Sequence, residues 1–282
     1  MAYTFGAATG DDISWTESSS PWGATQRSGL ICGWWYPTTP LTAGRTLWCV
    51  GPTNRASIAT TTSEIDIFVA RTTNSQDQTL GLGLTVDRWH FIAILASHFN
   101  TGAVDSFRVW RGYDTELPVL IPLNGTPPAA GAGNGVTTAT QVTIGNLQST
   151  GTVAFIGDIG RFDYIVATGA NGFLRNTAGT ISADEERQVF EQMVVPIWQG
   201  KYPTWYGSGE TQNNLLTHTV IDLQTPGGFY PRSLRNGGSI PAMDASAGTR
   251  VVTASGVTPS LRRAPIPTLR PVSFHDRMMN MR

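Results

Sequence analysis

Two carboxylates lie two residues apart in the stretch Ser63 to Val69. The apolar residues around them predict a strand, and alternating side chains of a strand share one face. Paired carboxylates are the groups with which glycosidases work, and a retaining mechanism needs a nucleophile and a general acid about 5–5.5 Å apart. Glu64 and Asp66 are followed by Phe68 and Val69, so no general acid stands nearby. We therefore expect no catalysis and interpret the two acids as the outward face of a strand.

The histidines of the chain are isolated from other reactive groups. His90 follows Trp89 in an apolar run, and no serine, cysteine or second acid is placed by sequence to complete a triad with it. His98, His218 and His275 share no metal-ligand spacing with each other. We expect His90 to be packed and hydrogen-bonded, and we predict no enzymatic activity.

The chain has two cysteines, Cys32 and Cys49. If the runs around them form a hairpin about the loop 37–44, the two residues face each other across it. They would then be close enough for a disulfide or a pair of buried thiols, and a reducing cytoplasm favours the thiols. A tetrahedral metal site would also need a nearby histidine, so we expect no metal here.

Composition narrows the class of protein. Charged residues make up 14% of 282 residues and the formal net charge is −1, which excludes charge-driven disorder and gives no global attraction to nucleic acid or to an anionic membrane. No apolar run approaches the ~18 residues of a membrane span. The start of the chain lacks the charged segment and apolar stretch of a signal peptide. We expect a protein assembled in a cytoplasm.

The pattern of apolar residues predicts strands from about residue 12 to 167 and then one helix. In the run 91–95, Phe91 and its alternate neighbours share one face and Ile92 and Ile94 the other, so this strand is predicted to be buried on both sides. Ser182 and Glu185 form a capping box that begins the helix. An apolar stripe from Val189 to Val194 follows, and Pro196 is expected to end the helix.

Six motifs, in their order and spacing, resemble laminin-G-like domains of the concanavalin A-like lectin/glucanase superfamily. The motifs are Gly33–Pro37, Asp87–Ala93, Phe107–Gly112, Val142–Asn146, Phe155–Gly160 and Ile181–Glu186. The resemblance implies an all-β fold: an antiparallel β-sandwich (jelly roll, laminin-G/concanavalin A-like) over residues 1–200, with one short helix at its C-terminal end. Residues 201–282 are expected to form an irregular extension that ends in a Pro/Arg-rich arm.

The same resemblance bears on catalysis and on calcium. Laminarinase-type glycosidases of this superfamily carry Glu-Ile-Asp followed by a second Glu, whereas Glu64 and Asp66 are followed by Phe68 and Val69. Many laminin-G-like sequences have Gly-x-Ile-Asp, where this chain has Gly157 to Gly160 and therefore lacks the acid. No cofactor is predicted, although Asp11, Asp12 and Asp158 are conceivable calcium ligands.

Aromatic side chains suggest a possible sugar platform, because rings stack on pyranose faces. Trp35 and Trp110 are the candidate platform residues. Trp15, Trp22 and Trp205 are further tryptophans that could be exposed. Packing in the core or between subunits would account for the same residues.

The C-terminal part is rich in arginine. Residues 232–282 contain eight arginines against Asp244 and Asp276, and the prolines among them favour an extended arm. Such an arm is predicted to lie on a neighbouring subunit. The arginines expected to pair with acidic groups of the partner are Arg262, Arg263, Arg270, Arg277 and Arg282. Phe274 is the one stacking aromatic near them, so nucleic acid is a less suitable partner.

The functional prediction combines the sandwich with this arm. The chain resembles laminin-G-like proteins encoded among tailed-phage virion genes, which implies a non-enzymatic virion structural protein. Capsid decoration or cementing through the arm is the expected role, with capsid protein or sister subunits as partners and a homo-oligomer as the expected state. The alternative is a host-attachment or glycan-binding module on a tail or fibre, with Trp35 and Trp110 facing the sugar.

Overall fold

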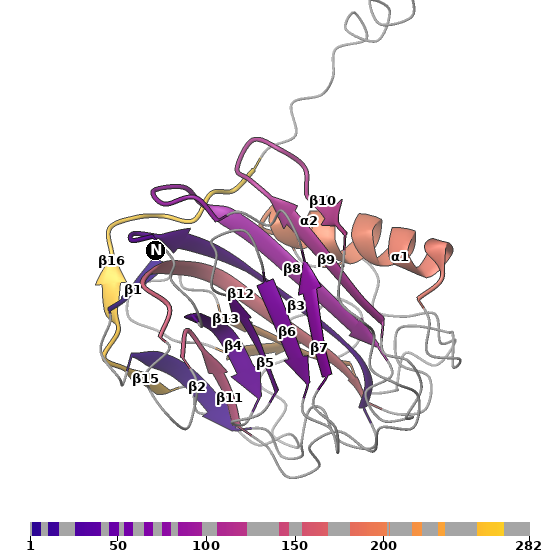
Figure 1. The fold of residues 1–282 in the computed structure, drawn as a ribbon, viewed down its shortest axis with the longest axis horizontal. Helices are drawn as coiled ribbons and strands as arrows, with labels where there is room; N and C mark the ends of the chain where they lie inside the picture. Colours follow the sequence, from indigo (N-terminus) through magenta and orange to yellow (C-terminus); the bar gives the residue numbers. More distant parts are fainter. Residues whose placement is uncertain are drawn as a thin grey trace, which may run out of the picture.

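The computed structural model describes fifteen tracts and one further residue of the chain. They are residues 2–6, 11–16, 26–40, 45–50, 54–58, 65–69, 75–79, 84–97, 106–122, 141–146, 154–168, 181–201, 203, 216–221, 231–234 and 253–267. Their strands form two sheets that pack face to face (Figure 1). Every pairing between these strands is antiparallel. The predicted fold class, an antiparallel β-sandwich with a short helix, is confirmed.

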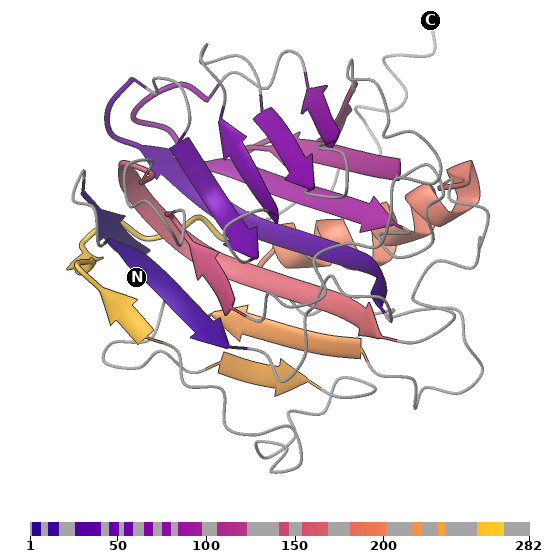
Figure 2. The same ribbon diagram turned by 60° about the horizontal axis from the view of Figure 1, so that its bottom comes forward.

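The first sheet has nine described strands, in the order β10-β9-β8-β3-β12-β1-β16, with β13 beside β12 and β14 beside β13. Figure 2 shows the two orange strands β13 and β14 next to the rose strand β12. The strands are β1 (Ala2–Phe5), β3 (Gln26–Pro37), β8 (His90–Ser97), β9 (Ser106–Gly112), β10 (Val119–Ile121), β12 (Gly157–Thr168), β13 (Leu216–Ile221), β14 (Pro231–Leu234) and β16 (Thr258–Ser260).

The second sheet has seven described strands, in the order β15-β2-β11-β4-β5-β6-β7. They are β2 (Asp12–Thr16), β4 (Arg45–Val50), β5 (Asn54–Ile58), β6 (Ile65–Val69), β7 (Ser75–Thr79), β11 (Gln141–Ile144) and β15 (Thr253–Ser255). Since β3 and β4 belong to different sheets, the predicted hairpin between Cys32 and Cys49 is wrong. The two cysteines form no disulfide and both are buried, and the Cys49 thiol donates to the carbonyl of Asn146 at 3.4 Å. Burial, together with the Asp163 carboxylate, raises the pKa of the Cys32 thiol.

The main core lies between the sheets and the second core lies under the helices. Alternation along a strand sends Trp35 into the first core and Trp34 into the second. Strand β8 follows the prediction: Ile92 and Ile94 face the other sheet, while Phe91 faces the helices. The first sheet is therefore covered on both faces.

Three short helical segments form this second cover: α1 (Ala183–Val189), the π-helix η1 (Phe190–Val194) and α2 (Val195–Trp198). The predicted capping box is present, because Glu185 N–H donates to the Ser182 hydroxyl and the Glu185 carboxylate accepts from Ser182 N–H. The predicted end at Pro196 is wrong, since the helix continues to Trp198. In a regular α-helix Pro196 would clash with the carbonyl four residues earlier, and the wider π-turn before it, in which Val195 N–H donates to Phe190 O, accommodates the proline.

Four described strands after residue 200 belong to the sandwich, which corrects the predicted boundary at residue 200. Strand β13 pairs with β12, β15 extends the second sheet beside β2, and β16 extends the first sheet beside β1 (Figure 1). We call residues 253–267 the C-terminal strap. Gly256, at φ +65°, makes the turn between its two strands, so the strap joins both sheets at one edge of the sandwich.

The end of the strap packs on the helix-facing side of the first sheet. Ala264 is buried there, and a Cβ at Gly160 would lie 2.4 Å from the Cβ of Ala264. Glycine at position 160 is thus what lets the strap approach β12. A Cβ at Gly200 would lie 3.4 Å from Cγ2 of Ile266, which places the end of the strap beside the end of the helices.

Candidate functional site

An apolar groove lies between the start of the helix and the edge of the first sheet. Its volume is about 260 Å³, near the lower limit of about 300–1,000 Å³ for ligand pockets. We call it the β10–α1 groove; its lining residues are Trp110, Pro118, Leu120, Glu186, Arg187 and Phe190. A space of this size accommodates one large side chain or one sugar ring.

Two stacked aromatic rings form one wall of the groove. The rings of Trp110 and Phe190 have centroids 6.2 Å apart and an interplanar angle of 26°. Phe190 is the first residue of the π-helix, and such segments in other proteins often coincide with functional sites. Trp110 is only 2% exposed, so little of its ring is open to solvent at the groove.

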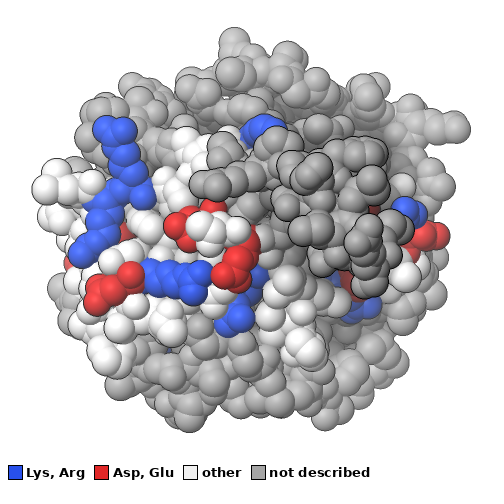
Figure 3. All heavy atoms as spheres, turned by 90° about the horizontal axis from the view of Figure 1, so that it is seen from above, with Lys and Arg blue, Asp and Glu red and all other residues white. Residues whose placement is uncertain are grey.

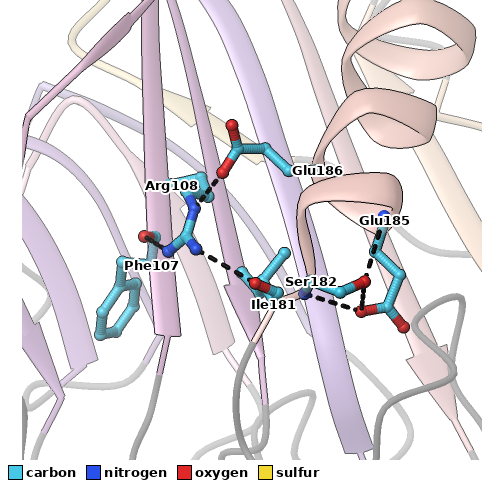
Figure 4. Close-up of polar contacts among 6 residues, drawn as sticks. All are labelled: Phe107, Arg108, Ile181, Ser182, Glu185 and Glu186. Carbon is cyan, nitrogen blue, oxygen red and sulfur yellow. Dashed lines mark hydrogen bonds and ion pairs between the residues drawn. The ribbon is translucent and has the colours of Figure 1, made fainter.

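The charged residues of the groove hold the helix against β9. Arg108 forms an ion pair with Glu186 and also donates to the carbonyl of Ile181, 3.2 Å away (Figure 4). Ile181 precedes the capping residue, so Arg108 fixes the start of the helix from β9. Arg187 pairs with Asp184 at 3.2 Å in an exposed position, where an ion pair adds little stability.

Large apolar side chains are exposed beside the groove. Leu117, Val119 and Leu120 have exposed fractions of 44%, 56% and 42%. Val119 and Leu120 belong to β10, the terminal strand of the first sheet as far as the sheet is described, and Leu117 precedes it. Leu120 faces the groove with Trp110, whereas Val119 lies on the opposite face of the strand with Ile121. Apolar side chains gathered at a sheet edge mark a surface that gains from being covered.

A second cluster lies above the sheet and combines arginine with aromatic rings. The Arg88 guanidinium lies 3.5 Å from the centroid of the Tyr113 ring, and the Arg262 guanidinium lies 4.6 Å from that of Tyr36. Trp89 packs edge-on against Tyr36 with centroids 5.3 Å apart. We call these five residues the Arg–Tyr rim. Seen from above, basic and acidic side chains alternate over the described part of this face (Figure 3).

Arg262 makes an ion pair inside its own chain, and its predicted role as a partner-binding arginine stays a prediction. Its Nη1 donates to Asp158 at 2.7 Å, and Thr4 Oγ1 donates to the same carboxylate at 2.5 Å. Asp158 is fully buried, whereas the Arg262 side chain is 46% exposed. The hydrogen bond to Asp158 raises the pKa of Arg262. Asp158 is therefore neutralised by a guanidinium.

His90 is buried as predicted. Its Nε2 donates to the carbonyl of Thr85 at 3.0 Å, and its ring packs against Tyr113 with centroids 5.2 Å apart. Burial lowers its pKa to about 4, and the nearby Arg111 and Arg88 act in the same direction. The imidazole is thus neutral at physiological pH, where it supports the rim from below.

The candidate platform tryptophans are not on the surface. Trp35 is 1% exposed in the core between the sheets, and Trp110 lies under Phe190. Trp35 is thus wrong as a platform residue, and Trp110 is wrong as an exposed one, because both faces of this sheet are covered. Trp15 is also buried, whereas Trp22 and Trp205 lie outside the described residues.

Some of the other predicted site residues are described by the structure and some are not. Arg263 is exposed in the strap, while Arg270, Arg277 and Arg282 lie outside the described residues. Of the glycosidase motif, Asp66 and Phe68 belong to β6 and Glu64 lies outside the described residues. Within the described ranges, no group of three His, Cys, Asp or Glu residues could hold a metal, and no helix is long and apolar enough to span a membrane.

Sequence reasoning missed the β10–α1 groove. Its walls come from β9, the segment before and within β10, and α1, which lie far apart in the chain. The signal that could have indicated it is the run Leu117 to Ile121, because all of its residues are apolar instead of alternating with polar ones.

Comparison with known proteins gives likenesses of fold. No protein family and no curated protein matches the chain. A heptameric SAP-like pentraxin from Limulus polyphemus has a TM-score of 0.40 and 10% identity over 58% of this chain and 74% of its own. A Bacteroides ovatus protein to which carbohydrate binding is attributed has a TM-score of 0.48 and 13% identity, over 94% of this chain and 61% of its own. Domains LG4-5 of the mouse laminin α1 chain have a TM-score of 0.36 and 10% identity, over 64% of this chain and 45% of their own. The chain thus spans less than two thirds of the length of the last two structures. At identities of 10–13%, these likenesses describe the fold alone.

Proposed function

We propose that this chain is a structural, non-catalytic subunit that associates with copies of itself through the β10–α1 groove. The supporting observation is the exposed Leu120 in a groove with an aromatic wall, at a sheet edge where Leu117 and Val119 are exposed as well. Interfaces that form assemblies carry such side chains at their centre and charged side chains at their margin. Here Glu186 and Arg187 occupy the margin.

The groove suits an apolar side chain better than a sugar. Four of its six lining residues are apolar, and Glu186 is already paired with Arg108. A sugar ring would need hydrogen-bonding groups around an exposed ring face, and Trp110 is only 2% exposed. An aliphatic or aromatic side chain needs only the apolar walls.

Sedimentation velocity of the full chain over a range of concentrations tests the proposal. Leu120→Glu places a charge in the groove and is expected to weaken association at least about 30-fold, the equivalent of about 2 kcal/mol for a central interface residue. Leu261→Glu is the matched control, because Leu261 is fully exposed in the strap. A chain that stays monomeric at 100 μM, or a Leu120→Glu variant that associates like wild type, would reject the proposal.

The finer form of the proposal is that the assembly is a tailed-phage particle, whose capsid the sandwich decorates or cements. It rests on the resemblance of the strand motifs to laminin-G-like virion proteins. Immunogold labelling of the purified native assembly is the test. Label over a phage capsid is expected, and label confined to tails, or absent from particles, contradicts capsid decoration.

Carbohydrate binding at the Arg–Tyr rim is the second candidate function. It is favoured by the half-buried rings of Tyr36, Trp89 and Tyr113 next to the exposed carboxylates of Asp87 and Glu116. A glycan array with the full chain should then give sub-millimolar binding to one sugar class. Tyr113→Ala should abolish this binding and Leu261→Ala should not. Binding that survives Tyr113→Ala removes the rim from consideration.

A further inference from the structure

The described chain ends near the β10–α1 groove, and this indicates which segment could fill the groove. Pro267 is buried, and the preceding Ile266 contacts the position of Gly200 at the end of the helices. Trp198, two residues before Gly200, donates its indole N–H to the carbonyl of Tyr113 at 2.7 Å. Tyr113 begins the turn that leads into Pro118 of the groove. The strap therefore delivers the rest of the chain to one end of the groove.

The remaining residues, 268–282, have the length needed to reach such a groove. Fifteen residues span up to about 50 Å when extended, and Gly200 lies about 15 Å along the helix from Phe190. Pro265, Pro267 and Pro271 stiffen the exit, and proline-rich chain runs straight for several residues. A stiff, extended segment favours contact with a neighbouring copy over a sharp return onto its own domain.

The chemistry of the segment also matches the groove. Residues 268–282 contain Arg270, Arg277 and Arg282 against Asp276 alone. Two exposed acids, Asp184 and Glu191, lie on the helical layer next to the residues that line the groove, whereas Glu186 in the groove is paired with Arg108. Opposite charges of this kind steer and orient two surfaces.

Apolar anchors are present in the same segment. Phe274 is its only aromatic residue, and Met278, Met279 and Met281 follow it. Methionine adapts to irregular apolar spaces and makes favourable contacts with aromatic rings, such as those of Trp110 and Phe190. The segment thus carries both kinds of group that the groove and its margin would bind.

We infer that residues 268–282 of a second copy dock in the β10–α1 groove, with Phe274 inserted beside Trp110 and Phe190. This inference rests on the proposed self-association and names the segment that carries it. Each subunit would offer one groove and one segment, so two copies can exchange segments in a closed dimer, or successive copies can form a ring or a filament.

Photo-crosslinking of the full chain tests the inference. Phe274 is replaced by p-benzoylphenylalanine, and equal amounts of ¹⁴N- and ¹⁵N-labelled chains are mixed before irradiation. Crosslinks to Trp110, Leu120 or Phe190 are expected in peptides that join the two labels. Leu120→Glu should lower their yield at least about tenfold. The photo-residue at position 261, in the exposed part of the strap, is the matched control and should give no crosslink to the groove.

A synthetic peptide of residues 268–282 supplies a second measurement that needs no variant. It should disperse the oligomer of the full chain, and a peptide with Phe274→Ser should not. Groove crosslinks within one chain, or crosslinks outside the groove, overturn the inference. If association persists in those cases and still responds to Leu120→Glu, the proposed function stands without it. If the full chain never associates, both fail.

Discussion

Removing the guanidinium of Arg262 should destabilise the whole sandwich. In Arg262→Met the Asp158 carboxylate, which is fully buried, keeps only the Thr4 hydroxyl as a partner among the contacts described here. Breaking a buried ion pair from one side costs about 3–5 kcal/mol, because a charge is left without compensation. The Arg262 side chain is 46% exposed, so water can partly replace it. We therefore expect a loss of about 2 kcal/mol in the free energy of unfolding.

Urea denaturation followed by tryptophan fluorescence measures this loss. With an m-value of about 3 kcal/mol/M, the midpoint should fall by about 0.7 M. Arg263→Met is the matched control, because Arg263 is the exposed next residue of the strap and should change the midpoint little. The double variant Asp158→Asn/Arg262→Met removes both charges and should regain most of the loss. If Arg262→Met behaves like Arg263→Met, the ion pair does not hold the strap.

Three further predictions concern the strap and His90. Deleting residues 253–282 removes β15 and β16 and should abolish cooperative unfolding, whereas deleting 268–282 should preserve it; equal near-UV circular dichroism spectra for both would contradict this. Gly160→Ala should cost about 1–3 kcal/mol through its contact with Ala264, and Ala264→Gly should restore stability in the double variant; urea midpoints without such rescue would refute the close packing. His90 has a pKa of about 4 when folded and 6.5 as its usual value, so the unfolded chain binds the proton first as the pH falls. Stability is then lost on acidification, by about 2 kcal/mol between pH 7 and 5, and His90→Gln should lose less over that interval; an unchanged pH profile would contradict a buried neutral imidazole.

Local patterns predicted the parts of the fold that depend on neighbouring residues in sequence. The alternation through Phe91 and Ile92 follows from the period of a strand, and the capping box at Ser182 follows from the amides at a helix start. Both are confirmed because no distant residue is needed to define them.

Pairing between distant segments was not predictable in the same way. Cys32 and Cys49 lie on consecutive apolar runs, but the chain crosses from one sheet to the other between them. Composition suggested an irregular arm after residue 200 because β15 and β16 are three residues each and polar outside. Such short strands are stable here because each extends an existing sheet, and Arg262 neutralises an acid 104 residues away.

The strap links the stability of the sandwich to its proposed assembly. It fixes Pro267 beside the end of the helices, and therefore sets where residues 268–282 begin relative to the β10–α1 groove. Loosening the strap by Arg262→Met should then weaken association as well as folding, although Arg262 does not line the groove. Sedimentation at a urea concentration where the variant is still folded separates the two effects. Weaker association than in Arg263→Met is expected, because an arm whose starting point is less fixed has a lower effective concentration at the neighbouring groove. Equal association of the two variants would mean that the strap serves only the fold.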